Sequence, residues 1–334
     1  MAKVRRASEA KRRPATIDET LRALSAGEQG TLNAKVFYGL SDLSEADVEK
    51  LKTAWLELGT EYRRKLLLRL EDVSETNFDL DFRAFGLFAL EDEDAEVRKS
   101  AIGVLWSDES LAYMRRLMEL AQWDESTDVR AAAASELGRF ILMAELGDLP
   151  EDDIIPAQDL VIALMTDESE ELDVRRRALE AISNSSHEVV EEAIREAYEH
   201  SELLMRVSAV FAMGRSCDEQ WGPLVLREMH SVEPEMRYEA ARAAGELMLA
   251  EAVPHLAKVA QGNDREIKEV AIWSLGEIGG REALRVLTAL AQDADVQDDK
   301  DLLEVVEDAI GMATLAGGDL PFFLDTDARR EREN

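Results

Sequence analysis

The residues best able to hold a metal ion or act as a nucleophile are few in this chain of 334 residues. The four histidines are His187, His200, His230 and His255, and no two of them have the His-x-His or His-x-x-x-His spacing that places two imidazoles on one ion. Cys217 is the single cysteine, so neither a Cys/His zinc set nor an intramolecular disulfide can form. The sequence therefore predicts no metal site and no bound cofactor.

Motifs for covalent or phosphate chemistry are also missing from the sequence. There is no Gly-rich phosphate loop of the P-loop kind and no G-x-S-x-G nucleophile elbow. Ser216-Cys217-Asp218 follows a predicted helix, where small polar residues are ordinary helix-end residues. Carboxylate pairs occur throughout so acidic a chain and single out no general acid or base. We therefore expect no catalytic residue.

The charge of the chain is strongly negative, with 71 acidic against 39 basic residues and a net charge of −32. This balance argues against nucleic acid and against an anionic membrane surface as partners, because both require clustered Lys and Arg. Solubility, adaptation to salt or the base composition of the genome would explain the acidity, and so would a basic protein partner. The sequence leaves these explanations open.

We expect a cytoplasmic protein, because the sequence shows neither a membrane-spanning stretch nor a secretory signal. No stretch approaches the roughly 18 apolar residues that a membrane-spanning helix needs. The start of the chain, MAKVRRASEAKRRP, is basic but has no apolar segment behind it, unlike a secretory signal. A single cysteine is typical of a reducing compartment.

One sequence motif, which we call the phrase, occurs several times and indicates how the chain is organised. EMRYEAARAAGEL (Glu235 to Leu247) is followed 31 residues later by EIKEVAIWSLGEI and preceded 31 residues earlier by LMRVSAVFAMGRS. A constant period of about 20–50 residues indicates a repeat array. Aligned on their basic residues, the copies begin at Arg98, Arg130, Arg175, Arg206, Arg237 and Lys268, with intervals of 32, 45, 31, 31 and 31 residues.

Each repeat predicts two helices. The phrase has apolar residues on one helical face, and a second amphipathic stretch precedes it, such as AVPHLAKVAQG before Lys268. Pro223 and Pro254 fall in the first turn of these preceding helices, and Gly214, Gly245 and Gly276 fall near the ends of the phrases, as caps or close-contact points. A lone hairpin cannot bury both of its apolar faces, so the hairpins must stack.

The pattern A-x-P-x-L, then an acid, then V-R-x-x-A-x-x-A-L-G resembles the HEAT repeat, in particular the short HEAT-like repeats of phycobilisome lyases. Glu251 to Gly279 is the best copy. The resemblance covers residues 77–316 and a degenerate first unit at 44–71. It implies an all-α fold, a right-handed α-solenoid of seven or eight stacked helical hairpins.

The resemblance also implies an Asp–Arg ladder between neighbouring repeats, formed by acids that precede the aligned basic residues. Leu204 replaces the acid before Arg206, so we expect the ladder to be broken there. Iron hydroxylases with HEAT-like repeats bind metal through repeated His-Glu dipeptides, of which only His187-Glu188 occurs here. The acid–basic pairs are Glu96/Arg98, Asp128/Arg130, Asp173/Arg175, Glu235/Arg237 and Glu266/Lys268.

The array is predicted to lie between two terminal segments. Residues 1–14 form a basic flexible tail that is either a plain leader or a contact to an acidic partner or nucleic acid. Residues 15–43 form a helical cap, and Ser44 with Asp47 predicts a capping box for a helix through about Leu58. The solenoid occupies residues 44–316, with an insertion near 140–158 that we expect to be an acidic surface loop. In 317–334, Phe322, Phe323 and Leu324 are expected to cover the last repeat.

A partner-binding surface is expected on the second helices, which line the concave face of HEAT-like solenoids. Positions 1, 4, 5 and 9 after the basic residue face away from the predicted core, yet several are apolar or aromatic. These side chains either bind a partner or pack between adjacent helices. The candidate partner-binding residues are Val210, Phe211, Arg215, Tyr238, Arg242, Ile272, Trp273 and Glu277.

The function that this pattern favours is a non-enzymatic protein-binding scaffold or adaptor with a protein partner. The alternatives are a lyase-like or chaperone-like subunit related to the phycobilin lyases, or a regulatory subunit of a larger complex. A chromophore that copurifies with the protein would favour the lyase.

Overall fold

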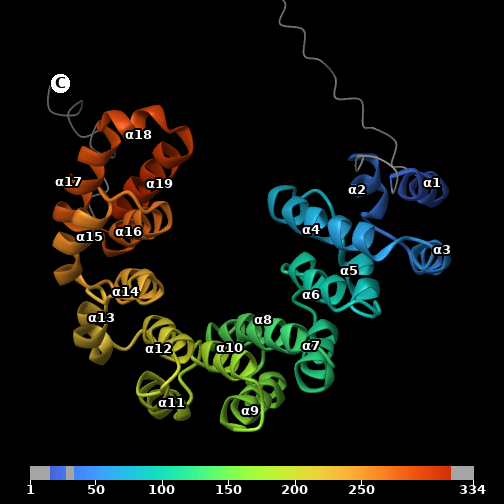
Figure 1. The fold of residues 1–334 in the computed structure, drawn as a ribbon, viewed down its shortest axis with the longest axis horizontal. Helices are drawn as coiled ribbons and strands as arrows, with labels where there is room; N and C mark the ends of the chain where they lie inside the picture. The colour runs from blue at the N-terminus through green and yellow to red at the C-terminus, as the bar shows by residue number, and fades with distance from the viewer. Residues whose placement is uncertain (1–15, 28–33, 317–334) are drawn as a thin grey trace, which may run out of the picture. The chain divides into compact units, whose positions relative to one another are not determined.

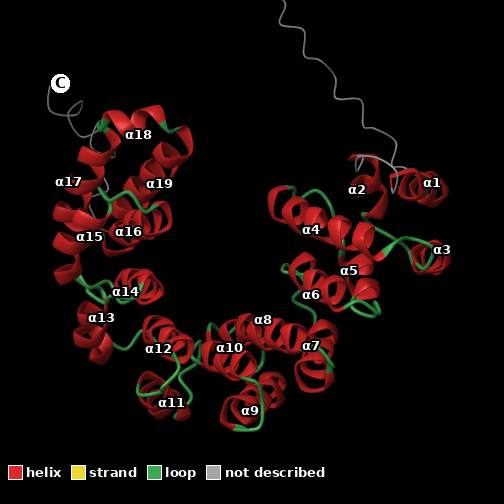
Figure 2. Cartoon of the chain, viewed as in Figure 1, coloured by secondary structure: helices red, strands yellow, loops and turns green. Residues whose placement is uncertain are grey.

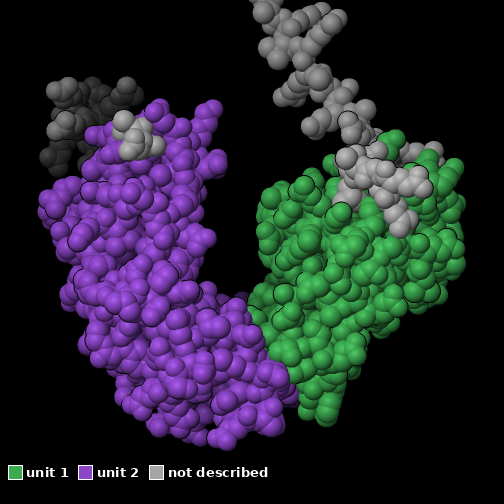
Figure 3. Space-filling view, viewed as in Figure 1, with its two compact units in different colours: residues 1–140 green, residues 141–334 purple. Residues whose placement is uncertain are grey.

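The computed structural model describes residues 16–27 and 34–316, and every regular element in these residues is a helix (Figures 1 and 2). The expected basic tail at 1–14 and the covering segment at 317–334 lie outside the described residues. The chain divides into two compact units, residues 1–140 and 141–334 (Figure 3).

Unit 1 begins with two short helices, in the segment predicted to be the N-terminal cap, and continues with helical hairpins. In α3 the predicted capping box is present, since the Ser44 hydroxyl accepts from the Asp47 N–H and the Asp47 carboxylate accepts from the Ser44 N–H. The helices are α1 (Ile17–Gly27), α2 (Ala34–Leu40), α3 (Glu45–Trp55), α4 (Thr60–Thr76), α5 (Arg83–Ala89), α6 (Ala95–Val104), α7 (Leu111–Trp123) and α8 (Thr127–Glu145), the last of which ends in unit 2.

Unit 2 continues the same hairpin pattern. Its elements are α9 (Glu151–Thr166), α10 (Leu172–Ile182), α11 (Val189–Tyr198), α12 (Leu203–Arg215), η1 (Glu219–Trp221), α13 (Gly222–Glu228), α14 (Pro234–Glu246), η2 (Ala250–Ala252), α15 (Val253–Val259), α16 (Arg265–Ile278), α17 (Gly280–Ala291), α18 (Ala294–Asp298) and α19 (Lys300–Ala316).

Second helices pack side by side within unit 2, in the order α10, α12, α14, α16 and α19 (Figure 1). Each also packs on the first helix of its own hairpin, as α11 does on α12 and α15 on α16. Pro223 and Pro254 lie in the first turns of α13 and α15, as predicted. The prediction of an all-α solenoid of stacked hairpins is confirmed.

Glycine marks the places where adjacent second helices touch. A Cβ added to Gly245 of α14 would lie 2.8 Å from the Cα of Ser274 in α16. A Cβ on Gly214 of α12 would lie 2.9 Å from the Cα of Ala243 in α14. These glycines therefore lie where two helices are in close contact, which is one of the two roles predicted for them.

The turn that follows the second helix recurs with the repeat. Cys217, Met248 and Gly279 are separated by 31 residues, and all three have positive φ, at 51°, 49° and 62°. Cys217 is exposed and lies in this turn, which is the structural role expected for Ser216-Cys217-Asp218.

The insertion near 140–158 is not the expected surface loop. The additional residues lengthen the hairpin, because α8 runs to Glu145 and α9 begins at Glu151, so that only residues 146–150 are non-helical. Pro150 is the N-cap of α9, and Pro156 lies inside the helix. Pro150 suits a helix start, where its missing N–H has no partner to lose, and Pro156 is accommodated in the second turn of α9.

Candidate protein-binding surface

The solvent-facing side of α12, α14 and α16 contains three rows of residues in register. Because the repeat is 31 residues long, the same helical position recurs on each helix, and the helices lie side by side. The middle row contains Phe211, Arg242 and Trp273, all half-buried. The row before it contains Val207, Tyr238 and Glu269, and the row after it contains Arg215, Glu246 and Glu277.

Two of the eight predicted residues do not belong to this surface. Val210 and Ile272 are completely buried, so they cannot contact a partner. The reason is that the next helix covers their position. The Ser274 hydroxyl of α16 donates to the Ala241 carbonyl of α14 at 2.8 Å, and Ala241 is the counterpart of Val210 and Ile272. These two residues are core.

Phe211 lies beneath two guanidinium groups. The Cζ of Arg242 lies 4.1 Å from the ring centroid, and the Cζ of Arg215 lies 5.6 Å from it. Arg242 also donates from Nη2 to the Phe211 carbonyl at 3.2 Å. Guanidinium groups at these distances are attracted to the face of an aromatic ring, so the three side chains support one another.

The charges around Phe211 are compensated within the chain. Arg242 pairs with Glu239 at 2.7 Å and also with Glu246, while Arg215 lies 3.2 Å from the same Glu246 carboxylate. The Arg242 and Glu246 side chains are only 13% and 12% exposed. Burial raises the pKa of Glu239, and the neighbouring Arg242 opposes that shift. Arg242 is thus fixed by internal pairs, whereas Arg215 is exposed.

Tyr238, Trp273 and Glu277 each keep part of their surface in solvent. Burial is the main cause that raises the pKa of the Tyr238 hydroxyl, with the carboxylate of Glu239 adding to it. The structure therefore brings six of the eight predicted residues to one face. They form a surface of half-exposed aromatic rings next to paired charges, which we call the inner-row surface: Phe211, Arg215, Tyr238, Arg242, Trp273 and Glu277.

Sequence reasoning missed the most exposed aromatic residues, which lie in unit 1. Trp123 at the end of α7 is 75% exposed, and Phe78 between α4 and α5 is 80% exposed. The Phe78 ring lies edge-on to Trp106, with centroids 6.2 Å apart. The sequence does indicate that Trp123 is exposed, because it directly precedes the acids Asp124 and Glu125, after the apolar face of the helix has ended.

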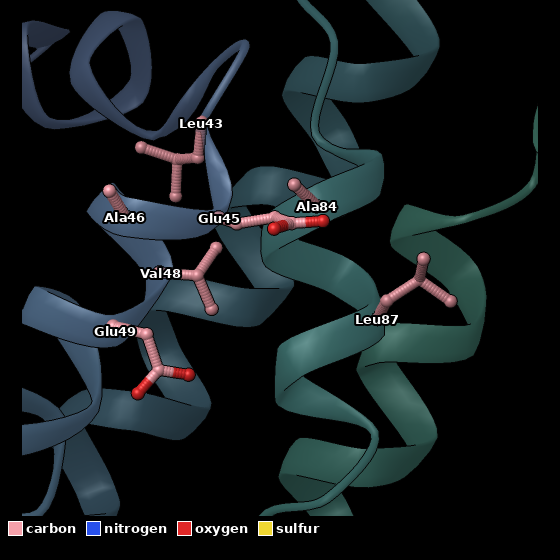
Figure 4. A pocket seen from close by; sticks show the side chains of 7 residues that line it. All are labelled: Leu43, Glu45, Ala46, Val48, Glu49, Ala84 and Leu87. Carbon is pink, nitrogen blue, oxygen red and sulfur yellow. The ribbon is translucent and has the colours of Figure 1, made fainter.

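Unit 1 also has an apolar cavity of about 560 Å³ between α3 and α5 (Figure 4). Leu43 and Val48 lie on the α3 side, Leu87 lies on α5, and the Glu45 carboxylate extends toward Ala84. The cavity is lined by Leu43, Glu45, Ala46, Val48, Glu49, Ala84 and Leu87.

In residues 16–27 and 34–316, no three His, Cys, Asp or Glu side chains gather in a way that could hold a metal ion. Over the same residues, no helix combines the length and the apolar character needed to cross a membrane.

Comparison with known proteins agrees with the repeat pattern. Residues 222–306, which include α13 to α17, match the family model for HEAT repeats. This part of the chain consists of HEAT repeats. The recognition of HEAT-like repeats in the sequence is thereby confirmed, and the hairpins outside residues 222–306 have the same two-helix form. No curated protein matches the sequence.

Several solved structures are similar to this chain. The complex of CpcE and CpcF of phycocyanin lyase from Nostoc sp. PCC7120 has a TM-score of 0.47 at 17% identity, covering 69% of this chain and 94% of that one. Human deoxyhypusine hydroxylase has a TM-score of 0.35 at 17% identity, covering 89% and 97%. Yeast importin-beta has a TM-score of 0.45 at 14% identity, covering 90% of this chain and 46% of that one.

Proposed function

We propose that this HEAT-repeat chain is a non-enzymatic scaffold or adaptor that binds a protein partner through the inner-row surface of unit 2. The observation that carries the proposal is that Phe211, Tyr238 and Trp273 are half-buried on three adjacent helices, in two neighbouring rows of one face. A merely solvated helix face would have polar residues at these positions.

The energetics of this surface favour protein binding. Aromatic and Arg side chains supply most of the binding energy of protein interfaces, and they do so best where neighbouring groups exclude water. The internal pairs of Arg242 with Glu239 and Glu246 leave few unpaired charges to desolvate when a partner covers the face.

We further propose that the partner is basic. The chain has a net charge of −32, and Glu269 and Glu277 lie in the rows on either side of Trp273. Opposite charge on the partner would speed association and would make binding weaken as salt is added.

The test compares the wild type with the double variant Phe211→Ala/Trp273→Ala and with Trp123→Ala, which removes a more exposed Trp from unit 1. Proteins retained by each form from a lysate of the native host are identified by mass spectrometry. Loss of a specific partner from the double variant alone, with helicity and melting close to wild type, supports the proposal. Because Phe211 also contacts Arg242, the single variant Trp273→Ala is measured in parallel.

Three results would overturn the proposal. A large loss of stability in Trp273→Ala would make the ring part of the core. Retention of the same partners by all variants would place binding elsewhere on the chain. A bilin that copurifies with the protein, or activity on a bilin, would favour the lyase-like alternative instead.

A further inference from the structure

The hairpins of unit 1 are joined by a buried ion pair. Arg98 of α6 donates from Nε and Nη2 to the two carboxylate oxygens of Asp124, at 2.8 and 2.7 Å. Its Nη1 donates to the Asp92 carbonyl at 2.8 Å. Asp124 lies six residues before Arg130, the aligned basic residue of the next repeat. The guanidinium of one repeat therefore pairs with a carboxylate in the turn of the following repeat and donates to a carbonyl in the turn before its own helix.

The corresponding carboxylate is absent in unit 2. Arg175 of α10 is the aligned basic residue, and the residue six positions before the next one, Arg206, is His200. Arg175 donates from Nε to the Met165 carbonyl at 3.3 Å. Among the described residues, no carboxylate forms an ion pair with it, although the negative charge of Asp167 lies near enough to interact with Arg175. Asp167 itself accepts two hydrogen bonds from Ser169.

A cavity of about 220 Å³ is lined by Arg175 and His200. In the repeat, these two residues have the positions that Arg98 and Asp124 have in unit 1, where they form an ion pair. The walls of the cavity include the buried side chains of Met165, Leu179 and Met205, together with Arg175 and His200. The full lining is Met165, Thr166, Glu168, Arg175, Leu179, Ala193, Glu196, Ala197, His200 and Met205.

The wall of the cavity has hydrogen-bond donors that suit an anion, whereas its rim has acidic side chains. The Nδ1 of His200 accepts from the Glu202 N–H at 3.1 Å, which leaves Nε2 as the proton-bearing nitrogen of the neutral ring. Arg175 and His200 thus offer donors to an anion. Glu168 and Glu196 are exposed and would attract a cation at the rim. A ligand with a negative group, a positive group and a short apolar side chain would match the donors, the acidic rim and the apolar wall.

We propose that this cavity binds a small apolar α-amino acid. Its carboxylate takes the place that Asp124 has beside Arg98 and accepts from Arg175 and His200. Its ammonium group faces Glu168 and Glu196, and its side chain lies against Met165, Leu179 and Met205. The volume suits a molecule of this size, because pockets for drug-sized ligands begin at about 300 Å³. The site is separate from the inner-row surface.

The test is calorimetric titration of the full chain with L-leucine, with isovalerate and with isoamylamine, three molecules that share one branched apolar chain. We expect leucine to bind best, isovalerate at least tenfold more weakly, and isoamylamine not at all. Equal binding of isoamylamine and leucine would overturn the proposal, because Arg175 and His200 would then contribute nothing. The absence of leucine binding at millimolar concentration would also overturn it.

A designed carboxylate makes the test sharper. His200→Asp supplies Arg175 with the partner that Arg98 already has, so this variant should melt at a higher temperature than wild type and lose leucine binding at least tenfold. The matched control is Ser231→Asp, at the same position one repeat later, where the Ser231 carbonyl accepts from Arg237. This control should keep leucine binding unchanged. Leucine affinity that is equal in His200→Asp and wild type would exclude the cavity as the site.

Discussion

Asp92 shows how much one buried side chain contributes in unit 1. Its carboxylate accepts at 2.6 Å from Arg63 Nη1 and at 2.6 Å from Trp55 Nε1, and it also accepts from the N–H of Asp94. We expect Asp92→Asn to lower the free energy of unfolding by about 3–5 kcal/mol, because the buried Arg63 guanidinium then keeps only the exposed Glu93, at 2.8 Å, as an ion-pair partner. Chemical denaturation followed by circular dichroism measures the loss.

The control for Asp92 is an exposed ion pair of the same unit. Lys52 and Glu49 are 2.5 Å apart, but both side chains are largely in solvent. Lys52→Ala should change the free energy of unfolding by less than about 1 kcal/mol, since surface pairs contribute little. Equal losses in Lys52→Ala and Asp92→Asn would show that burial does not decide the strength of these pairs.

His255 makes the stability of unit 2 sensitive to pH. Burial lowers the pKa of His255, and the charges of His230 and Lys258 lower it further, while a hydrogen bond involving the Met229 backbone opposes the shift. A histidine whose pKa is lower in the folded than in the unfolded state stabilises the protein fully above the unfolded value of about 6.5 and loses this contribution as the pH falls.

We therefore expect the melting temperature to fall less between pH 7 and pH 5 in His255→Gln than in wild type. Buried carboxyl groups such as Glu136 and Glu239, whose pKa values burial raises, act in the opposite direction in both proteins. The difference between the two pH profiles thus isolates His255. Parallel profiles would mean that the ring is equally easy to protonate in the folded and unfolded states.

At the scale of helices, the contacts between second helices depend on glycine. Gly245→Ala would place a methyl group 2.8 Å from the Ser274 backbone, so α14 and α16 would have to separate. We expect a loss of about 1–3 kcal/mol in the free energy of unfolding, the usual range for overpacking. Thermal and urea denaturation of the purified chain measure it.

The matched substitution is in α19, where a Cβ on Gly311 would meet nothing within 4 Å. Gly311→Ala should raise the free energy of unfolding by about 0.5–1 kcal/mol, because alanine favours a helix interior over glycine. Losses of similar size in both variants would show that the glycines serve something other than close packing.

The helices were predictable because their signals are local. The 31-residue period, the Ser44–Asp47 capping box and Pro223 and Pro254 all act within a few residues or repeat visibly. The insertion at 140–158 was predicted wrongly, since an acidic, proline-containing stretch suits a helix start as well as a loop. Val210 and Ile272 were assigned to the surface because the cover provided by the next helix depends on how two helices approach.

The ladder between repeats needed the structure as well. The acids that pair with Arg63 and Arg98 are Asp92 and Asp124, in the turns before α6 and α8, and not the acids Glu96 and Asp128 of the repeated motif. The break expected at Leu204 is present, because Arg206 donates to the His200 and Ser201 carbonyls and forms no ion pair among the described residues. Arg175 already lacks a carboxylate partner among the described residues, and it donates to a backbone carbonyl instead. Spacing alone could not tell which acid faces the next repeat.

At the scale of the whole chain, the charge of −32 should make stability depend on salt. Raising NaCl from about 0.1 M to about 1 M shortens the screening length from about 10 Å to about 3 Å, which weakens the repulsion between surface carboxylates. We expect the melting temperature to rise. A fall would mean that attraction between the surface ion pairs outweighs the repulsion, and calorimetry at several NaCl concentrations distinguishes the two outcomes.

The turns at Cys217, Met248 and Gly279 have the same sign of φ although their residues differ. The chain therefore contains three sequence variants of one repeat position, since this position is Cys217, Met248 or Gly279 in three repeats of the same molecule. Exchanging side chains between such sites would separate what the fold demands from what a particular repeat has acquired. Positions that resist the exchange would be those with a task beyond folding.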